Sequence, residues 1–291
     1  MTASYLVGLI GSGIQTSLTP ALHEGEADAL GLRYLYRLID IDRLGKTATD
    51  AAELVRAARD VGYDALNITH PCKQTVFDAL DELSPDAELL GAVNTVLFRD
   101  GRTIGLNTDH SGFASGLRDG LTAPVVDRVV LLGSGGAGSA IAYALLNAGT
   151  TRLSVYDPVI ERADAVCRAL GPAFPGAQVV AITPDELAAA IAAADGLVNA
   201  TPIGMTGHPG MPIPATLLHS RLWVADAVYR PLRTELIETA DALGCAVLDG
   251  GRMAVGQAAD AFRLITGAEP DPVRMRAHFL QLTGALSAAS R

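Results

Sequence analysis

The chain reads Val129-Val130-Leu131-Leu132-Gly133-Ser134-Gly135-Gly136-Ala137-Gly138 near its midpoint, and small and apolar residues at helical spacing follow up to Asn147. Gly149 ends this expected helix, and Leu153-Ser154-Val155-Tyr156 forms a second apolar run that stops at Asp157. A strand, a glycine turn, a helix and a second strand within about 30 residues are typical of the βαβ unit that binds dinucleotides. The stretch therefore predicts a Rossmann-type domain with a doubly wound parallel sheet.

The glycines of this turn are expected to serve a dinucleotide in different ways. Gly133 permits the tight turn, Gly135 lets the backbone approach a pyrophosphate, and Gly138 lets the helix pack close to its strand. The N–H groups at the start of the helix have no partner within it and favour phosphate oxygens. A glycine-rich turn alone occurs in many α/β proteins, but here the flanking strands and helix agree with cofactor binding. The residues expected to bind the cofactor at this turn are Gly133, Ser134, Gly135, Gly136 and Ala137.

Asp157 indicates which nicotinamide cofactor the domain uses. A carboxylate at the end of the second strand accepts hydrogen bonds from ribose hydroxyls and repels a 2′-phosphate, which favours NAD over NADP. The alternative is a solvated turn residue before Pro158. Arg162 is a candidate for the adenine side of the site, and an exposed helix face describes it equally well.

Composition limits the class of protein. The chain has 291 residues, of which 49% are hydrophobic, and a formal net charge of −10. The negative charge argues against nucleic acid or an anionic membrane as partner, and there is no apolar run of spanning length and no signal-type N-terminus. The cysteines, Cys72, Cys167 and Cys245, form neither a disulfide framework nor a zinc pattern, so we expect no metal and a cytoplasmic location.

Apolar runs and amphipathic helices alternate along the rest of the chain, which predicts an α/β protein of two domains. We expect a substrate domain with a mainly parallel sheet in residues 1–110, completed by residues 252–291, and an NAD-binding Rossmann domain in residues 111–251. Asp100-Gly101 between two apolar runs predicts a β-hairpin. A helix is expected to follow Lys73.

Polar residues gather at the ends of the early predicted strands. In an open α/β sheet, ligands bind at the carboxyl ends of the strands. Hydroxyl and amide groups with one cation and one carboxylate suit a small polyhydroxylated acid. Singly, each has an ordinary structural explanation, such as a helix N-cap or a turn, so the prediction depends on the whole set. Its members are Ser17, Thr19, Asn67, Thr69, Lys73, Asn94 and Asp109.

These motifs, taken in order, resemble the shikimate dehydrogenase family over nearly the whole chain. The matching segments are Ser17-Leu18-Thr19-Pro20, Asn67-Ile68-Thr69-His70-Pro71-Cys72-Lys73, Gly91-Ala92-Val93-Asn94-Thr95, Gly105-Leu106-Asn107-Thr108-Asp109, Asn199-Ala200-Thr201-Pro202 and Gly256-Gln257-Ala258-Ala259. The resemblance implies NAD(P)-linked oxidation of the C3 ring hydroxyl of shikimate or quinate.

The resemblance also implies residue roles. Lys73 and Asp109 form the catalytic pair. Ser17 and Thr19 hold the substrate carboxylate, while the residues expected to hold ring hydroxyls are Thr69, Asn94 and Gln257. Further cofactor-binding residues are expected at the later strand ends and the start of the last long helix: Thr201, Pro202, Met205, Val228, Gly250 and Met253. Met253 is described equally well as an apolar filler.

The pair of residues allows two assignments of the proton. Lys73 must be neutral to accept the hydroxyl proton while hydride leaves to the nicotinamide. Asp109 nearby favours its charged form, and the two groups can share the proton as a coupled pair.

At two places the chain departs from the pattern of the biosynthetic enzymes of this family. In both it resembles the NAD-dependent quinate/shikimate dehydrogenases of actinobacterial type. Gly13-Ile14-Gln15-Thr16-Ser17 lacks the family's usual Pro and His, and Asp157 replaces the start of a basic clamp for a 2′-phosphate. The alternatives are a biosynthetic NADP-dependent shikimate dehydrogenase, a relative for an amino analogue, a ligand-sensing protein without turnover, and a folate dehydrogenase. A monomer and a homodimer are both compatible with the sequence.

Overall fold

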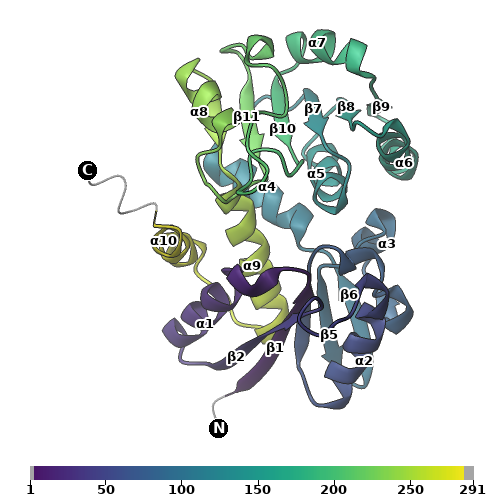
Figure 1. Ribbon diagram of the computed structural model, residues 1–291, viewed down its shortest axis with the longest axis vertical. Helices are drawn as coiled ribbons and strands as arrows, with labels where there is room; N and C mark the ends of the chain where they lie inside the picture. Colours follow the sequence, from purple (N-terminus) through teal and green to yellow (C-terminus); the bar gives the residue numbers. More distant parts are fainter. Residues whose placement is uncertain (1–2, 285–291) are drawn as a thin grey trace. The chain divides into compact units, whose positions relative to one another are not determined.

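The computed structural model describes residues 3–284. The chain folds into two compact units (Figure 1). The first contains the residues up to Thr108 and those from Gln257 onward, and the second runs from Asp109 to Gly256. Each unit is built on its own six-stranded sheet, which confirms the predicted α/β architecture with two sheets. Among residues 3–284, no helix has the length and apolar character needed to cross a membrane.

The sheet of the first unit is mixed, with strand order β2-β1-β3-β5-β6-β4. Only β5 runs against its neighbours, and the remaining pairs are parallel. The strands are β1 (Ser4–Gly11), β2 (Arg33–Asp40), β3 (Ala65–Ile68), β4 (Glu82–Leu83), β5 (Thr95–Arg99) and β6 (Arg102–Leu106). The expected hairpin joins β5 to β6, and Asp100 and Gly101 adopt the positive φ values of 51° and 76° that such a turn requires.

Helices of the first unit cover this sheet with their small and apolar faces, except that α10 packs against α1. The helices are α1 (Thr19–Ala29), α2 (Ala51–Asp60), α3 (Pro85–Leu90) and α10 (Pro272–Leu282), and α9 (Gly250–Thr266) spans the boundary between the units. Val55 and Ala58 of α2 pack on Leu66 and Ile68 of β3 in one core cluster. Phe262 of α9 belongs to a second cluster with β1 and β2.

The prediction of a helix after Lys73 is wrong. Two short 3₁₀ turns occupy this region instead, Cys72–Gln74 and Phe77–Ala79. The backbone N–H of Thr75 donates to the carbonyl of Cys72, closing a three-residue turn, and its hydroxyl donates to the same carbonyl and to the carbonyl of Ala48. The carbonyl that would start an α-helix is therefore taken by Thr75.

The second unit has an all-parallel sheet with strand order β12-β11-β10-β7-β8-β9, of which Figure 1 labels β11 to β9. The strands are β7 (Arg128–Leu132), β8 (Arg152–Tyr156), β9 (Gln178–Ala181), β10 (Gly196–Asn199), β11 (Trp223–Asp226) and β12 (Ala246–Leu248). The helices are α4 (Asp109–Gly120), α5 (Gly136–Asn147), α6 (Ile160–Leu170), α7 (Pro184–Ala192) and α8 (Glu235–Ala242). The central strands are buried throughout, as continuous apolar runs in parallel sheets should be. The predicted Rossmann-type sheet is confirmed.

Candidate active site

Two glycines of the turn after β7 are explained by the protein itself. Gly133 has φ +91°, and a Cβ there would lie 2.9 Å from the carbonyl carbon of Ala200. A Cβ on Gly138, in the first turn of α5, would collide with the carbonyl oxygen of Gly133. A side chain at Gly133 would push away the loop after β10, and one at Gly138 would push the helix away from the end of its strand.

Gly135 has no such internal reason to be glycine. Its φ is −70°, which any residue adopts, and no atom lies within 4 Å of the position its Cβ would take. It caps α5 without a side-chain hydrogen bond, and the N–H groups of the first helical turn have no acceptor within the helix. The turn therefore offers open space beside backbone donors, which fits the pyrophosphate of a dinucleotide.

Asp157 follows β8 and closes this turn. Its Oδ2 accepts hydrogen bonds from the backbone N–H and the hydroxyl of Ser134, at 3.1 and 2.8 Å, and its Oδ1 accepts from the N–H of Val159 at 3.0 Å. Partial burial raises the pKa of Asp157, but these hydrogen bonds and the charge of Arg162 outweigh burial and hold the pKa below its ordinary value. An ionised carboxylate has about four acceptor sites, so it retains capacity for ribose hydroxyls. Arg162 is exposed on α6.

The other expected cofactor residues of this unit lie after β10, after β11 and in the first turns of α9. A Cβ on Gly133 would lie 3.0 Å from Cγ2 of Thr201, so the loop after β10 borders the turn. Gly250, at the start of α9, lies against the backbone carbonyl of Val228, which a Cβ there would strike. Pro202 and Met205 are exposed on the loop after β10, and Met253 is half-buried on α9.

Backbone hydrogen bonds gather the expected substrate residues of the first unit at the carboxyl edge of its sheet. The N–H of Thr69 donates to Ile10, at the end of β1, at 2.9 Å. The N–H of Val93 donates to the carbonyl of Lys73 at 2.9 Å, and that of Asn94 donates to Leu106 at 3.0 Å. The loops that carry Thr69, Lys73 and Asn94 therefore meet.

Ser17 and Thr19 lie at the start of α1. The N–H of Thr19 donates to the Ser17 hydroxyl at 3.3 Å, and the two hydroxyls are 3.2 Å apart. The loop that leads to them is folded around Asp40, whose carboxylate accepts from the side chain of Gln15 at 2.9 Å. Hydrogen bonds from Gln15 and from backbone N–H groups, against the effect of burial, lower the pKa of Asp40.

Asn94 is 3% exposed and is fixed by a buried polar network. Its Nδ2 donates to the hydroxyl of Thr108 at 2.9 Å, and its Oδ1 accepts from the N–H of Thr108 at 2.8 Å. Asn67 lies in the same network, where it donates to the hydroxyl of Thr95 and accepts from the hydroxyl of Tyr36. The network holds the chain where it leaves the first unit.

The structure places the members of the expected catalytic pair on different units. Lys73 is half-buried in the 3₁₀ turn Cys72–Gln74 of the first unit. Asp109 is the first residue of α4, is 6% exposed, and belongs to the second unit. Gln257 lies in α9, where the chain returns to the first unit. Their joint action on one substrate stays a prediction.

Two polar residues of the second unit escaped the sequence-based prediction of the site. Asn199 and Asp226 end β10 and β11 and are almost fully buried. The sequence feature that could have identified them is a single polar residue at the end of a short apolar run, in each of the two strands. Such a position is typical of the ligand edge of a parallel sheet.

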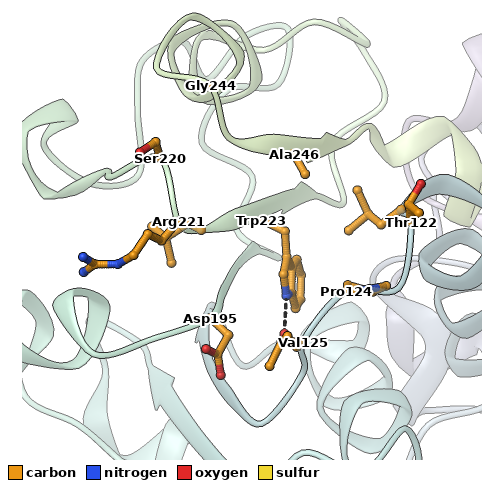
Figure 2. Close-up of a pocket in the computed structure, with 11 residues that line it drawn as sticks. Thr122, Pro124, Val125, Asp195, Ser220, Arg221, Trp223, Gly244 and Ala246 are labelled. Atoms are coloured by element: carbon orange, nitrogen blue, oxygen red, sulfur yellow. Dashed lines mark hydrogen bonds between the residues drawn. The ribbon is translucent and has the colours of Figure 1, made fainter.

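Two hollows in the second unit lie at the opposite, amino ends of the strands. One pocket, of about 320 Å³, is lined by Trp223, Arg221 and Asp195 among others (Figure 2). Its wall is fixed by a 2.7 Å hydrogen bond from the Trp223 indole to the carbonyl of Val125. The other lies beside the starts of β7, β8 and β9. Neither adjoins the glycine turn at the carboxyl edge.

Known proteins resemble this chain over its whole length. Residues 9–96 match the family described as the shikimate dehydrogenase substrate binding domain. A shikimate dehydrogenase (NADP(+)) of Pseudarthrobacter chlorophenolicus is 58% identical over 99% of both chains. A quinate/shikimate dehydrogenase (NAD(+)) of Corynebacterium efficiens is 50% identical over 96% of this chain and 99% of that one.

A solved structure, the quinate dehydrogenase from Corynebacterium glutamicum in complex with NAD, agrees with a TM-score of 0.90 at 48% identity, covering 96% of this chain and all of the other. Relatives named for either cofactor thus match 96% or more of the chain. The identity is higher with the relative named for NADP, so it does not support the expected nearer kinship with the NAD-dependent group.

Proposed function

Because the chain belongs to the shikimate dehydrogenase family, we propose that it interconverts shikimate and 3-dehydroshikimate, and quinate and 3-dehydroquinate, with NAD as its preferred cofactor. The first unit binds the substrate and the second binds the cofactor. The observation that carries the cofactor preference is the ionised Asp157 at the glycine turn. A cytoplasmic location remains a prediction, and a monomer and a homodimer are both compatible with this function.

The residues of the first unit suit an acid that carries several ring hydroxyls. Ser17 and Thr19 present neighbouring hydroxyls at the start of α1, where they donate to the substrate carboxylate. Thr69, Asn94 and Gln257 are assigned to the ring hydroxyls. The network around Asn94 holds its amide in one orientation, so it recognises a hydroxyl without first being ordered.

Lys73 and Asp109 are assigned to the proton of the C3 hydroxyl. A bound nicotinamide supplies the chemistry of hydride acceptance and donation. Lys73 and Asp109 take up the hydroxyl proton as a coupled pair during oxidation and return it during reduction.

The cofactor preference follows from charge. NADP would bring its 2′-phosphate close to the Asp157 carboxylate. At a separation of about 4 Å and an effective dielectric constant near 20, the repulsion is about 4 kcal/mol per pair of charges before screening. The segment that follows, Pro158-Val159-Ile160-Glu161, offers no cation before Arg162 to offset it.

The second candidate is an NADP-linked shikimate dehydrogenase. It is supported by the 58% identity with the enzyme of that name from Pseudarthrobacter chlorophenolicus. A single residue at the ribose site can change cofactor preference without changing overall identity, so the two observations do not exclude one another.

Initial rates that follow reduced nicotinamide by absorbance decide between the candidates. Shikimate and quinate are each tested with NAD and with NADP at matched concentrations. Turnover with NAD well above that with NADP supports the proposal, and the reverse supports the second candidate. Absence of turnover in all four combinations, together with binding of shikimate or quinate, would indicate a ligand-sensing relative instead.

A further inference from the structure

Two polar side chains end neighbouring central strands of the second unit. Asn199 is the last residue of β10 and Asp226 the last of β11, and the parallel register pairs them directly. Their exposed fractions are 0% and 3%. Burying a carboxylate is unfavourable unless hydrogen-bond donors surround it, so the donors around Asp226 show what it holds in place.

Asp226 binds three separate parts of the chain. Its Oδ1 accepts from the N–H of Val228 and from Nδ2 of Asn199, each at 2.9 Å. Its Oδ2 accepts from the hydroxyl of Thr234 at 2.7 Å, and Thr234 is the N-cap of α8. One buried carboxylate therefore fixes the backbone after β11, the end of β10 and the start of α8.

Asn199 in turn holds the loop that follows β10. Its Oδ1 accepts from the N–H and the hydroxyl of Thr201, at 3.0 and 2.6 Å. Its Nδ2 donates to the carbonyl of Ile203 at 3.1 Å as well as to Asp226. The loop is folded around this one amide, and the amide is oriented by Asp226.

The Thr201 segment borders the glycine turn, and the Val228 segment borders the start of α9. Thr201 approaches Gly133, and Val228 packs against Gly250 at the start of α9. Both segments therefore lie at the carboxyl edge of the sheet, after β10 and β11, and the Thr201 segment lies beside the position that suits the pyrophosphate. The adenosine side of the cofactor, by contrast, is assigned to Asp157 on the other side of β7.

We propose that Asp226 and Asn199 are positioning residues for the nicotinamide half of the cofactor, acting through the Thr201 loop and the Val228 backbone. This rests on the proposed function: because Asp157, after β8, takes the adenosine, the nicotinamide half extends to the other side of β7, over the ends of β10 and β11. If the pair served stability alone, its loss would weaken all nucleotide ligands alike or none of them. If it positions the nicotinamide half, its loss weakens NAD and spares ADP, which contains only the adenosine and the two phosphates.

The test compares binding of NAD and of ADP to the full chain in wild type, Asp226→Ala and Asp226→Asn. The Ala variant removes all three acceptors, and we expect its Kd for NAD to rise about tenfold or more while its Kd for ADP changes by less than about twofold. The Asn variant keeps an oxygen for Asn199 and Val228, and its amide can donate to the Thr234 hydroxyl. It should bind NAD within about threefold of wild type.

Thr183→Ala is the matched control, because Thr183 begins α7 in the same unit and its hydroxyl bonds Glu186 rather than Asp226 or Asn199. It should lower stability through the lost cap of α7 and leave NAD affinity unchanged. An Asp226→Ala variant that binds NAD as wild type does, or that loses NAD and ADP equally, overturns the inference.

A second variant serves if Asp226→Ala does not fold. Asn199→Asp keeps the size and the acceptor for Thr201 but loses the donations to Asp226 and Ile203. Combining it with Asp226→Asn restores a donor between the two strand ends. NAD affinity should fall in the single variant and recover in the double variant, and a double variant without recovery overturns the inference. Wild type that binds neither NAD nor NADP refutes the proposed function itself, whereas wild type that binds NAD with unaltered variants refutes only the positioning role.

Discussion

Asp157, which directly follows β8, holds Ser134 through one carboxylate oxygen, which accepts hydrogen bonds from the backbone N–H and the hydroxyl of Ser134. Ser134 is the second residue of the glycine turn, so the residue assigned to cofactor choice also shapes the phosphate loop. Substitutions of Asp157 therefore change two properties at once, and a control must separate them.

The first prediction concerns cofactor choice. Asp157→Asn removes the charge and keeps an oxygen for Ser134, so it should lower kcat/KM for NAD and raise that for NADP. The wild-type preference for NAD should exceed about tenfold, since even a third of the unscreened repulsion is about 1.4 kcal/mol. The variant should narrow this ratio without reversing it, because Arg162 is the only cation near this segment in the sequence.

Ser134→Ala is the control for the loop. It removes only the hydroxyl bond to Asp157 and leaves the charge in place, so it should affect both cofactors by the same factor. A wild type that prefers NADP, or an Asp157→Asn variant with an unchanged ratio, contradicts the assignment.

The second prediction concerns Lys73. Lys73→Ala should reduce kcat by about 10²- to 10⁴-fold, the range for losing a positioned acid or base. Substrate affinity should change much less, because Ser17, Thr19 and Asn94 remain. Lys46→Ala is the matched control: Lys46 belongs to the same unit and pairs with the exposed Glu53 at 3.2 Å, so its loss should leave kcat unaltered. Turnover of Lys73→Ala within a few-fold of wild type would remove Lys73 from the chemistry.

A structural feature could be predicted from the sequence when the residues that determine it lie close together along the chain. The βαβ unit was predictable because its turn, helix spacing and strand ends lie within one short stretch, and the hairpin because Asp100-Gly101 by itself favours the turn. The 3₁₀ turns around and after Lys73 could not be predicted in this way. The hydroxyl of Thr75 donates to the carbonyl of Ala48, which lies far away in the sequence.

The same reasoning applies to the candidate site. Each strand-end residue could be named from its own motif, but the order of the strands could not. Asn199 and Asp226 become partners only because β10 and β11 are neighbours in the sheet. The pairing of Lys73 with Asp109 remains a prediction, since the two residues belong to different units.

The third prediction separates the glycines of the turn. Gly135→Ala meets no atom within 4 Å, so it should change the free energy of unfolding by less than about 1 kcal/mol, the cost of a poorer N-cap. It should nevertheless weaken NAD at least about tenfold, because the methyl group occupies the space left for the pyrophosphate.

Gly138→Ala, in contrast to Gly135→Ala, should lower the free energy of unfolding clearly. Its methyl group would collide with the carbonyl of Gly133, so unfolding in urea should show a loss of about 1–3 kcal/mol, as expected for overpacking. If Gly135→Ala binds NAD like wild type, the open space beside it does not receive the cofactor.

The last prediction concerns the stability contributed by Asp226 as a function of pH. Burial raises the pKa of Asp226 from its ordinary value of 3.8 to about 6, although hydrogen bonds from Thr234, Val228 and Asn199 oppose the rise. Between these two values the folded protein binds a proton that the unfolded chain has released. Stability from this group is therefore fully present below about pH 4 and is lost as the pH rises through about 6, by an amount on the order of 3 kcal/mol.

Asp226→Asn stays neutral at every pH and resembles the protonated carboxyl in size. Urea unfolding of both proteins from acid to neutral pH isolates this group, because all other titrations are common to the pair and cancel in the difference. The Asn variant should match wild type near pH 4 and become the more stable protein as the pH rises toward 7. A difference that does not vary with pH would show that Asp226 remains ionised in the folded protein throughout this range.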